Sequence, residues 1–287
     1  MPIKESELIL NSDGSIYHLN LKPEHLATTV LLVGDQNRVE KITNHFDKIE
    51  CTIQKREFKT QTGTYRGKRI SVISTGIGAD NIDIVLNELD ALVNIDFATR
   101  TVKKNLTRLD VIRIGTSGAI QKEIPVNSFL LSTYGLDITG MLHAYNIIRE
   151  CDTALGKAFV QFTNWKNNKA TPLFIKANDA LKDKFDSSNI HKGITVTSGG
   201  FYGPQGRVLR LALQDPELNT KFETFTLNGL RITNLEMETS AIYGLAKLLG
   251  HQAISLNAIL ANRTNGTFSE QPEAVIESLI SYTLDRL

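Results

Sequence analysis

The sequence predicts an α/β protein, a three-layer α/β/α sandwich around a central mixed β-sheet. Apolar runs typical of buried strands alternate several times with segments of helical periodicity. Two further segments have the pattern of antiparallel strands, so the expected sheet is mixed. A chain of 287 residues can bury a large core, so one domain over residues 1–287 is expected rather than two small ones.

The composition is that of an ordinary globular protein and argues against several classes of function. Hydrophobic residues make up 41% and charged residues 22%, and 32 Lys and Arg against 31 Asp and Glu give a net charge of +1. We find no basic stripe for nucleic acid, no polybasic patch for a membrane and no apolar run of membrane-spanning length. Cys51 and Cys151 form no metal-binding pair or disulfide framework, which predicts a reducing, cytoplasmic compartment.

The first half of the chain is expected to begin with an arm of residues 1–29 and a strand over Thr29–Val33. Asp35 follows this strand and is a good N-cap for an amphipathic helix. The next expected elements are strands over residues 53–60 and 70–74 with turns at Gly63 and Gly67, a Gly-rich turn over 75–78 that starts a helix, an exposed basic helix over 94–109 and a strand over 111–114.

The second half continues the alternation. Its expected elements are a strand over residues 129–132, helices over 155–161 and 177–185, a strand over 194–197, a helix from 235 to Gly250, a strand over 253–260 and a helix from Pro272. The Gly- and Pro-rich residues 198–207 between two of these elements predict a shaped loop, and such loops often carry binding groups.

Arg113 is the residue in this pattern that most needs an explanation. It lies in an apolar strand, and a buried guanidinium without an anionic partner is too costly to persist. The following residues Gly115, Thr116, Ser117 and Gly118 predict a tight turn whose amides and hydroxyls could hold an oxyanion. The alternative is a pair between Arg113 and a carboxylate of the protein, beside an ordinary turn.

Three other groups are candidates for binding. Gly34 lies where a strand meets a helix N-terminus, and Arg38 in the first helical turn suits an anion held between the two. Gln205 and Arg207, two residues apart in extended chain, point the same way and match a carbonyl-rich heterocycle, unless they are ordinary loop residues. Glu236 and Glu238 begin a helix, where they either cap it or form a partly buried acidic site.

Taken together, the motifs resemble the nucleoside phosphorylase-I family, in particular its uridine-cleaving members. The resemblance runs from about His18 to the last helix. It rests on Gly34-Asp35 with Arg38, Arg56-Glu57-Phe58, Thr75-Gly76-Ile77-Gly78, the stretch from Arg113 to Ile120, Gln205 with Arg207, Glu236-Met237-Glu238 and Asn262-Arg263-Thr264.

The resemblance implies a role for each candidate residue. Phosphate is held by Gly34, Arg38, Arg113 and Thr116, with Arg56 supplied by a neighbouring subunit; ribose is held by Thr116, Met237 and Glu238, with His18 from the neighbour; and the base is held by Phe201, Gln205 and Arg207. The catalytic residues implied are Arg113, Gln205, Arg207 and Glu238. Inorganic phosphate is a co-substrate, and no metal or organic cofactor is expected, although a monovalent cation could lie near Glu57 at a subunit contact.

The implied reaction is cleavage of uridine by phosphate to uracil and ribose 1-phosphate. The implied assembly is a homo-oligomer with a dimer as its minimal active unit, commonly a hexamer. Purine-specific relatives carry an Asp where Asn262 lies, and a neutral amide cannot protonate a leaving base, which favours a pyrimidine. The alternatives are a purine nucleoside phosphorylase, a nucleosidase of the same fold that uses water, and a non-catalytic nucleoside-binding protein.

Overall fold

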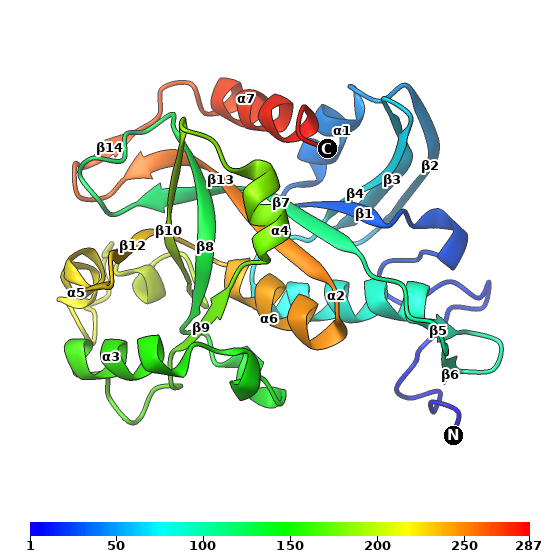
Figure 1. Cartoon of the computed structure of the whole chain (residues 1–287), viewed down its shortest axis with the longest axis horizontal. Helices are drawn as coiled ribbons and strands as arrows, with labels where there is room; N and C mark the ends of the chain where they lie inside the picture. Colours follow the sequence, from blue (N-terminus) through cyan, green and yellow to red (C-terminus); the bar gives the residue numbers. More distant parts are fainter.

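The computed structural model describes residues 1–287 as a twelve-stranded mixed sheet with helices on both sides (Figure 1). The strands are β1 Thr29–Val33, β2 Lys48–Lys55, β3 Phe58–Tyr65, β4 Lys68–Ser74, β7 Asp110–Ala119, β8 Phe129–Asp137, β9 Leu173–Lys176, β10 Ile190–Thr197, β11 Thr226–Leu227, β12 Leu230–Glu236, β13 Gln252–Asn262 and β14 Thr267–Phe268, with β5 Ile95–Asp96 and β6 Thr101–Val102 as a separate pair. The helices are α1 Gln36–Thr43, α2 Ala79–Asn94, α3 Thr153–Thr163, α4 Asp179–Phe185, α5 Leu218–Thr224, α6 Thr239–Leu249 and α7 Pro272–Leu284.

The sheet has a parallel centre, in which β4, β1, β7 and β13 are neighbours. Antiparallel pairing of β2 with β3 and of β3 with β4 extends one end. At the other end β12 pairs with both β10 and β7, so that β7, β13, β8, β10 and β12 form a closed ring. The predicted α/β class with a central mixed sheet is confirmed, and the closed ring is an addition that the sequence did not predict.

The helices cover both faces of the sheet because each carries one apolar face. Figure 1 shows α1 and α7 along one side and α2 and α6 along the other. Asp35 caps α1 as predicted, because its side chain accepts a hydrogen bond from the amide of Asn37. Gly250 ends α6 in the left-handed conformation, also as predicted. None of the helices has the length and hydropathy needed to span a membrane.

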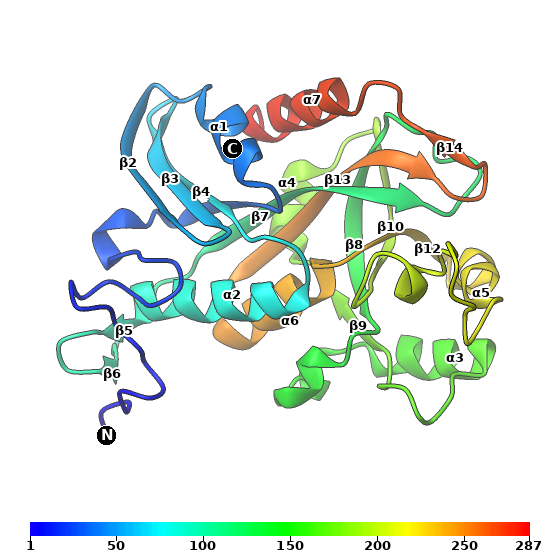
Figure 2. The same cartoon turned by 180° about the vertical axis from the view of Figure 1, so that it is seen from behind.

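The N-terminal arm is docked on the body of the protein. Leu8, Ile16, Leu19 and Leu21 are buried in the same hydrophobic core as the central strands. Figure 2 shows the arm beside α2 and the short β5–β6 hairpin. The arm is therefore held in position by apolar contacts in both of its halves.

The prediction of a helix over residues 94–109 is wrong. The segment forms the β5–β6 hairpin, which is turned by Arg100 in the left-handed region at φ 55°. Arg100 is hydrogen-bonded to the arm through both its backbone and its side chain: its carbonyl accepts from the Ile3 amide, and its side chain donates to the Ile3 and Leu8 carbonyls. These long-range bonds to the arm, which local propensity cannot reveal, stabilise the hairpin.

The predicted turn over residues 115–118 is also wrong, because β7 continues through it to Ala119. Gly115 and Gly118 pair with residues of β13 on one side, and Gly118 also pairs with Leu235 of β12 on the other. Gly115 serves a different purpose: a Cβ atom there would lie 2.7 Å from Nη2 of Arg113 and closer still to the rest of the guanidinium. The glycine leaves room for the arginine to fold back over its own strand.

Two further boundaries differ from the expectation. Arg56, expected on a strand, lies in the tight turn between β2 and β3 at φ 55°, whereas Gly63 lies inside β3, where a Cβ atom would overlap the Lys48 carbonyl oxygen. Glu236, expected on a helix, is the last residue of β12, and α6 begins only at Thr239. No pattern in the sequence predicted β9, β11, β14 or α5.

Candidate active site

A cavity of about 710 Å³ opens where the central strands end. Its walls come from the turns after β1 and β4, the second half of β7, the β12–α6 junction, the end of β13 and the loop after β10. The carboxyl ends of strands in open α/β sheets are the usual position for a ligand site. Of the predicted site residues, this cavity is lined by Gly34, Arg38, Arg113, Thr116, Phe201, Gln205, Arg207, Met237 and Glu238.

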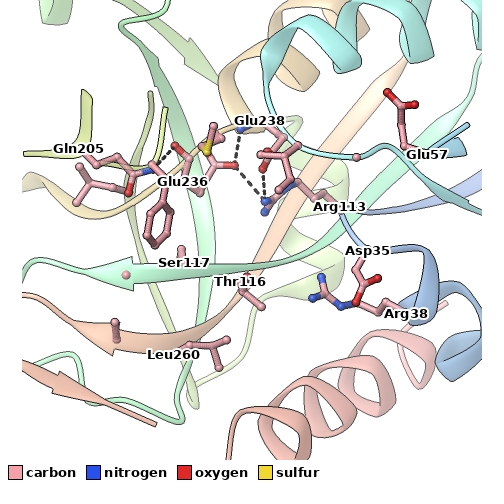
Figure 3. A pocket seen from close by; sticks show the side chains of 18 of the residues that line it. Asp35, Arg38, Glu57, Arg113, Thr116, Ser117, Gln205, Glu236, Glu238 and Leu260 are labelled. Atoms are coloured by element: carbon pink, nitrogen blue, oxygen red, sulfur yellow. Dashed lines mark hydrogen bonds and ion pairs between the residues drawn. The ribbon is translucent and has the colours of Figure 1, made fainter. Parts of the chain in front are cut away.

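Arg113 is paired with carboxylates of the protein, which is the alternative that the sequence left open (Figure 3). Its Nη2 lies 2.6 Å from Glu238 and 3.3 Å from Glu236, and its Nη1 donates to the Asn257 side chain at 2.9 Å. Burial lowers the pKa of Arg113, but the two carboxylates outweigh burial and raise it overall. The guanidinium is thus a fixed cation on the cavity wall, held in place from two sides.

Glu236 and Glu238 have different roles at the start of α6. The Glu236 carboxylate accepts hydrogen bonds from the Glu238 and Thr239 amides at 2.9 and 2.8 Å and from the Thr197 hydroxyl at 2.7 Å. Glu236 therefore supplies the cap that Glu238, the N-cap residue, does not. Burial raises the pKa of Glu236 above its ordinary value, with Arg113 acting against it.

The Glu238 carboxylate, in contrast, lies on the cavity wall. One of its oxygens accepts from the amide of Gly78 at 2.8 Å, and the other accepts from Arg113. Gly78 directly precedes α2, so the carboxylate also interacts favourably with a helix N-terminus. These two contacts hold the orientation of an acid that can accept hydrogen bonds from a ligand.

Arg38 lines the cavity near Arg113 and has no ionic partner. It forms no ion pair within the chain, and its only polar contact is a hydrogen bond from Nη1 to the Ile114 carbonyl at 3.2 Å. Burial lowers the pKa of Arg38, and the positive charge of Arg113 lowers it further. Two partly buried guanidinium groups that repel each other on one wall make this part of the cavity a site for an anion.

The opposite end of the cavity is built by the loop after β10. Gln205 and Arg207 are not on an extended chain as predicted, because Gly206 between them adopts φ 68° and follows a short 3₁₀ turn over Gly203–Gln205. The turn nevertheless brings them together: Arg207 donates to the Gln205 side-chain oxygen at 2.5 Å. Its guanidinium also lies over the Phe201 ring, 3.8 Å from the centroid.

Arg263 holds this loop in place through hydrogen bonds that the sequence did not predict. Its guanidinium donates to the backbone carbonyls of Gln205 and Gly206. Burial lowers its pKa to about 10, with a further contribution from the nearby charge of Arg207. The neighbouring Asn262 points away from the cavity, since its amide donates to the carbonyls of Gln121 and Ile124 at 2.8 Å each.

His18 and Arg56 do not line the cavity of their own chain. Both lie beside Tyr17: the His18 and Tyr17 ring centroids are 4.8 Å apart, and Cζ of Arg56 lies 6.0 Å from the Tyr17 ring centroid. The expectation that both serve a neighbouring subunit stays a prediction, as does the cation near Glu57, a residue that lines the cavity.

Several lining residues were not predicted to belong to the site. They are Asp35, Gln36, Asn37, Ile77, Leu235 and Phe268. Phe268, which is 66% exposed, reaches the cavity mouth because the short strand β14 folds back on Ala261. A two-residue strand has no periodicity, so no sequence signal could have identified it.

Comparison with known proteins decides the family of this site. The model of the phosphorylase superfamily matches residues 28–281. The chain belongs to this superfamily. The phosphorylase is 32% identical to a uridine phosphorylase of Thermococcus kodakarensis over 91% of its own length and 82% of the relative's, and 26% identical to a DeoD-type purine nucleoside phosphorylase of Bacillus subtilis over 93% and 97%.

A solved structure agrees with this assignment. The phosphorylase superposes on a Trypanosoma brucei nucleoside phosphorylase, described as having uridine phosphorylase activity, with a TM-score of 0.88, 26% identity and coverage of 98% and 99% of the two chains. The similar proteins thus act on uridine in two cases and on purine nucleosides in the third. The membership makes this chain a nucleoside phosphorylase by family, and the base it prefers is a separate question.

Proposed function

We propose that this phosphorylase cleaves uridine with inorganic phosphate, giving uracil and ribose 1-phosphate. The observation that carries the proposal is the division of the cavity into two ends. Arg38, without an ionic partner, and Arg113 form a cationic end, whereas Gln205 and Arg207 form an end rich in hydrogen-bond donors. Glu238 lies beside Arg113 and suits the ribose hydroxyls between them.

In the proposed mechanism, phosphate binds at Arg38, Arg113, Thr116 and the Gly34 backbone. Cleavage of the glycosidic bond builds positive charge on the sugar, and phosphate held beneath the anomeric carbon both stabilises that charge and attacks. Glu238 accepts hydrogen bonds from the 2′- and 3′-hydroxyls, and Met237 packs under the sugar.

The base leaves as an anion, and Arg207 with Gln205 stabilises it. The Arg207 guanidinium donates to the Gln205 side-chain oxygen, so the two polar groups lie together where they can bind the edge of a uracil. Phe201, whose ring already lies under the Arg207 guanidinium, packs against the base.

We further propose that the active form is a homo-oligomer, with a dimer as the minimal unit and a hexamer as the full assembly. The single domain of residues 1–287 then lends its arm to a neighbour: His18 meets the 5′-hydroxyl of the neighbour's nucleoside, and Arg56 meets its phosphate. The position of both residues outside their own cavity, beside the same tyrosine, supports this assignment.

A purine substrate is the second candidate, favoured by the similarity to DeoD-type enzymes. Asn262 counts against it, because this side chain carries no acid and is bonded to backbone carbonyls away from the cavity. A nucleosidase uses water and needs no phosphate site, so the unpaired Arg38 argues against this activity. A binding protein without activity does not need both a cationic end and a donor-rich end in one cavity.

The deciding experiment mixes the purified protein with uridine or inosine, with and without phosphate, and follows base release. Phosphate-dependent release of uracil supports the proposal; release without phosphate indicates a nucleosidase, preferential release of hypoxanthine a purine enzyme, and no release a binding protein.

A matched pair of variants tests the base end. Arg207→Ala is expected to lower kcat/KM for uridine by about 10²–10³-fold, the usual effect of removing one preorganised donor. Arg210→Ala, an exposed arginine of the same loop, is the control and should change little. A loss below tenfold for Arg207→Ala would show that the base is held by other groups.

A further inference from the structure

We propose that Glu88 is the positioning residue for His18, and that helix α2 thereby orients the imidazole offered to the neighbouring subunit's nucleoside. The inference rests on the proposed function, in which His18 meets the 5′-hydroxyl of the substrate. It assigns a role to a carboxylate on α2 that does not line the cavity and whose hydrogen bonds all go to the arm.

One carboxylate holds this part of the arm by four contacts. Glu88 Oε1 lies 3.0 Å from the His18 amide and 2.7 Å from His18 Nδ1, and Oε2 lies 3.1 Å from the His18 amide and 2.8 Å from the Leu19 amide. Only 12% of the Glu88 side chain is exposed. Such a partly buried carboxylate with several charge-assisted hydrogen bonds fixes both the backbone and the ring.

The backbone around His18 is shaped to present the ring. The Ile16 amide donates to the Leu21 carbonyl, the Asn20 amide donates to the Ile16 carbonyl, and Asn20 adopts φ 57°. The loop is thus closed at its base, and Ile16, Leu19 and Leu21 are buried in the core. Within it the side chain of His18 remains 26% exposed.

The hydrogen bond to Glu88 also selects the tautomer of the ring. An ionised carboxylate only accepts, so Nδ1 carries the proton, and Nε2 is the free ring nitrogen, with no partner in the chain. Nε2 of the neutral ring is then an acceptor suited to a hydroxyl. A carboxylate that orients a histidine through Nδ1 is a recurrent arrangement where the other nitrogen must meet a substrate or metal.

The arm has a second attachment that allows a matched control. Arg100 binds the Ile3, Lys4 and Leu8 carbonyls and so holds the beginning of the arm, at least ten residues before His18. If order in the arm as a whole were what mattered, loss of Arg100 would have the same effect as loss of Glu88. If Glu88 acts on the His18 ring, loss of Glu88 weakens the contact with the 5′-hydroxyl, whereas loss of Arg100 does not.

The test compares kcat/KM for uridine and for 5′-deoxyuridine, which lacks only the hydroxyl in question. We expect His18→Ala and Glu88→Ala each to lower the value for uridine roughly tenfold, the effect of one hydrogen bond, and to leave the value for 5′-deoxyuridine unchanged. The double variant should equal either single one, because both changes remove the same interaction. Arg100→Ala should alter neither substrate's value.

Activity on 5′-deoxyuridine also reports whether each variant is folded. Should Glu88→Ala not fold, Glu88→Gln keeps an acceptor for the backbone amides but offers Nδ1 a donor; it is expected to show a smaller loss, again with uridine alone. Equal losses on both substrates, an unchanged preference in either Glu88 variant, additive losses in the double variant, or the same uridine-specific loss in Arg100→Ala would each overturn the proposal.

Two results separate this inference from the function on which it rests. If His18→Ala has an effect and Glu88→Ala has none, the inference fails and the proposed function stands. If the unaltered protein releases no uracil from uridine, both fail. Mixed oligomers of Glu88→Ala and Arg38→Ala subunits add a direct test across the interface. The intact arm of the Arg38→Ala subunit should restore part of the preference for uridine in the cavity of the Glu88→Ala subunit. No recovery would overturn the proposal.

Discussion

Substitution of Gly115 by alanine is the sharpest test of how the cavity is built. The new methyl group would lie 2.7 Å from Nη2 of Arg113 and closer to Nη1 and Cζ, so the rigid guanidinium must move. It would lose Asn257 at 2.9 Å and Glu238 at 2.6 Å and leave both Glu238 and Glu236 buried without their cation. Breaking a buried ion pair in this way costs about 3–5 kcal/mol.

At roughly 2 °C for each kcal/mol in a chain of this size, we expect Gly115→Ala to lower the melting temperature by about 6–10 °C. Phosphorolysis of uridine should fall by about 10²-fold or more, with a raised KM for phosphate, because Arg113 is displaced from the cationic end. Thermal melting and steady-state kinetics measure the two effects.

Gly118→Ala on the same strand is the control for stability. A Cβ atom there meets nothing closer than the Arg263 side chain at 3.6 Å, which is an ordinary contact. Alanine is also no worse than glycine in a strand interior, so the melting temperature should hold or rise. If Gly115→Ala melts like Gly118→Ala and keeps uridine activity within tenfold, Arg113 does not need its observed position.

Three further predictions follow from buried groups. Asn262→Asp should lower stability by about 3 kcal/mol, because a carboxylate replaces the amide that donates to two backbone carbonyls, and should gain no activity on inosine; any gain would contradict the orientation of this side chain. Burial raises the pKa of Glu236 above its ordinary value, so the folded chain releases this proton at a higher pH than the unfolded chain does. Wild-type stability should therefore fall relative to Glu236→Gln as the pH rises above 4.5; chemical denaturation giving a pH-independent difference would refute this. Burial raises the pKa of Cys151 to about 11, so its alkylation, followed by mass spectrometry, should accelerate roughly tenfold per pH unit without levelling off below about pH 10.

The central strands could be predicted from the sequence because burial on both faces leaves a visible apolar run. Thr29–Val33 is such a run, and the structure has β1 with these bounds. The hairpin at 95–102 could not, since it depends on Arg100 contacting residues almost a hundred positions away. Gly115 and Gly118 favour a turn locally, yet pairing of both with β13, and of Gly118 also with β12, keeps them extended.

For the site, the sequence identified which charged side chains are candidates for binding, but not which other side chains they contact. Arg113 is recognisable as a buried cation that needs an anion, but Glu238, 125 residues away, is identified as its partner only by the fold. For Arg38 the fold shows the absence of a partner instead. The sequence shows a basic residue at a helix N-terminus, and the structure shows that no carboxylate forms an ion pair with it. The resemblance to a family supplied the list of site residues, and the geometry supplied their contacts.

The two ends of the cavity rest on different kinds of structure, and this has a consequence for how the molecule can change. Arg113 and Glu238 are tied to strands, a helix start and each other, so altering them risks the stability of the whole sheet. Gln205 and Arg207 lie on a loop, and Arg263 supports this loop by hydrogen bonds to two of its backbone carbonyls. Under the proposed function, evolution can therefore change which nucleobase is bound at little cost in stability, while the contacts to sugar and phosphate are kept.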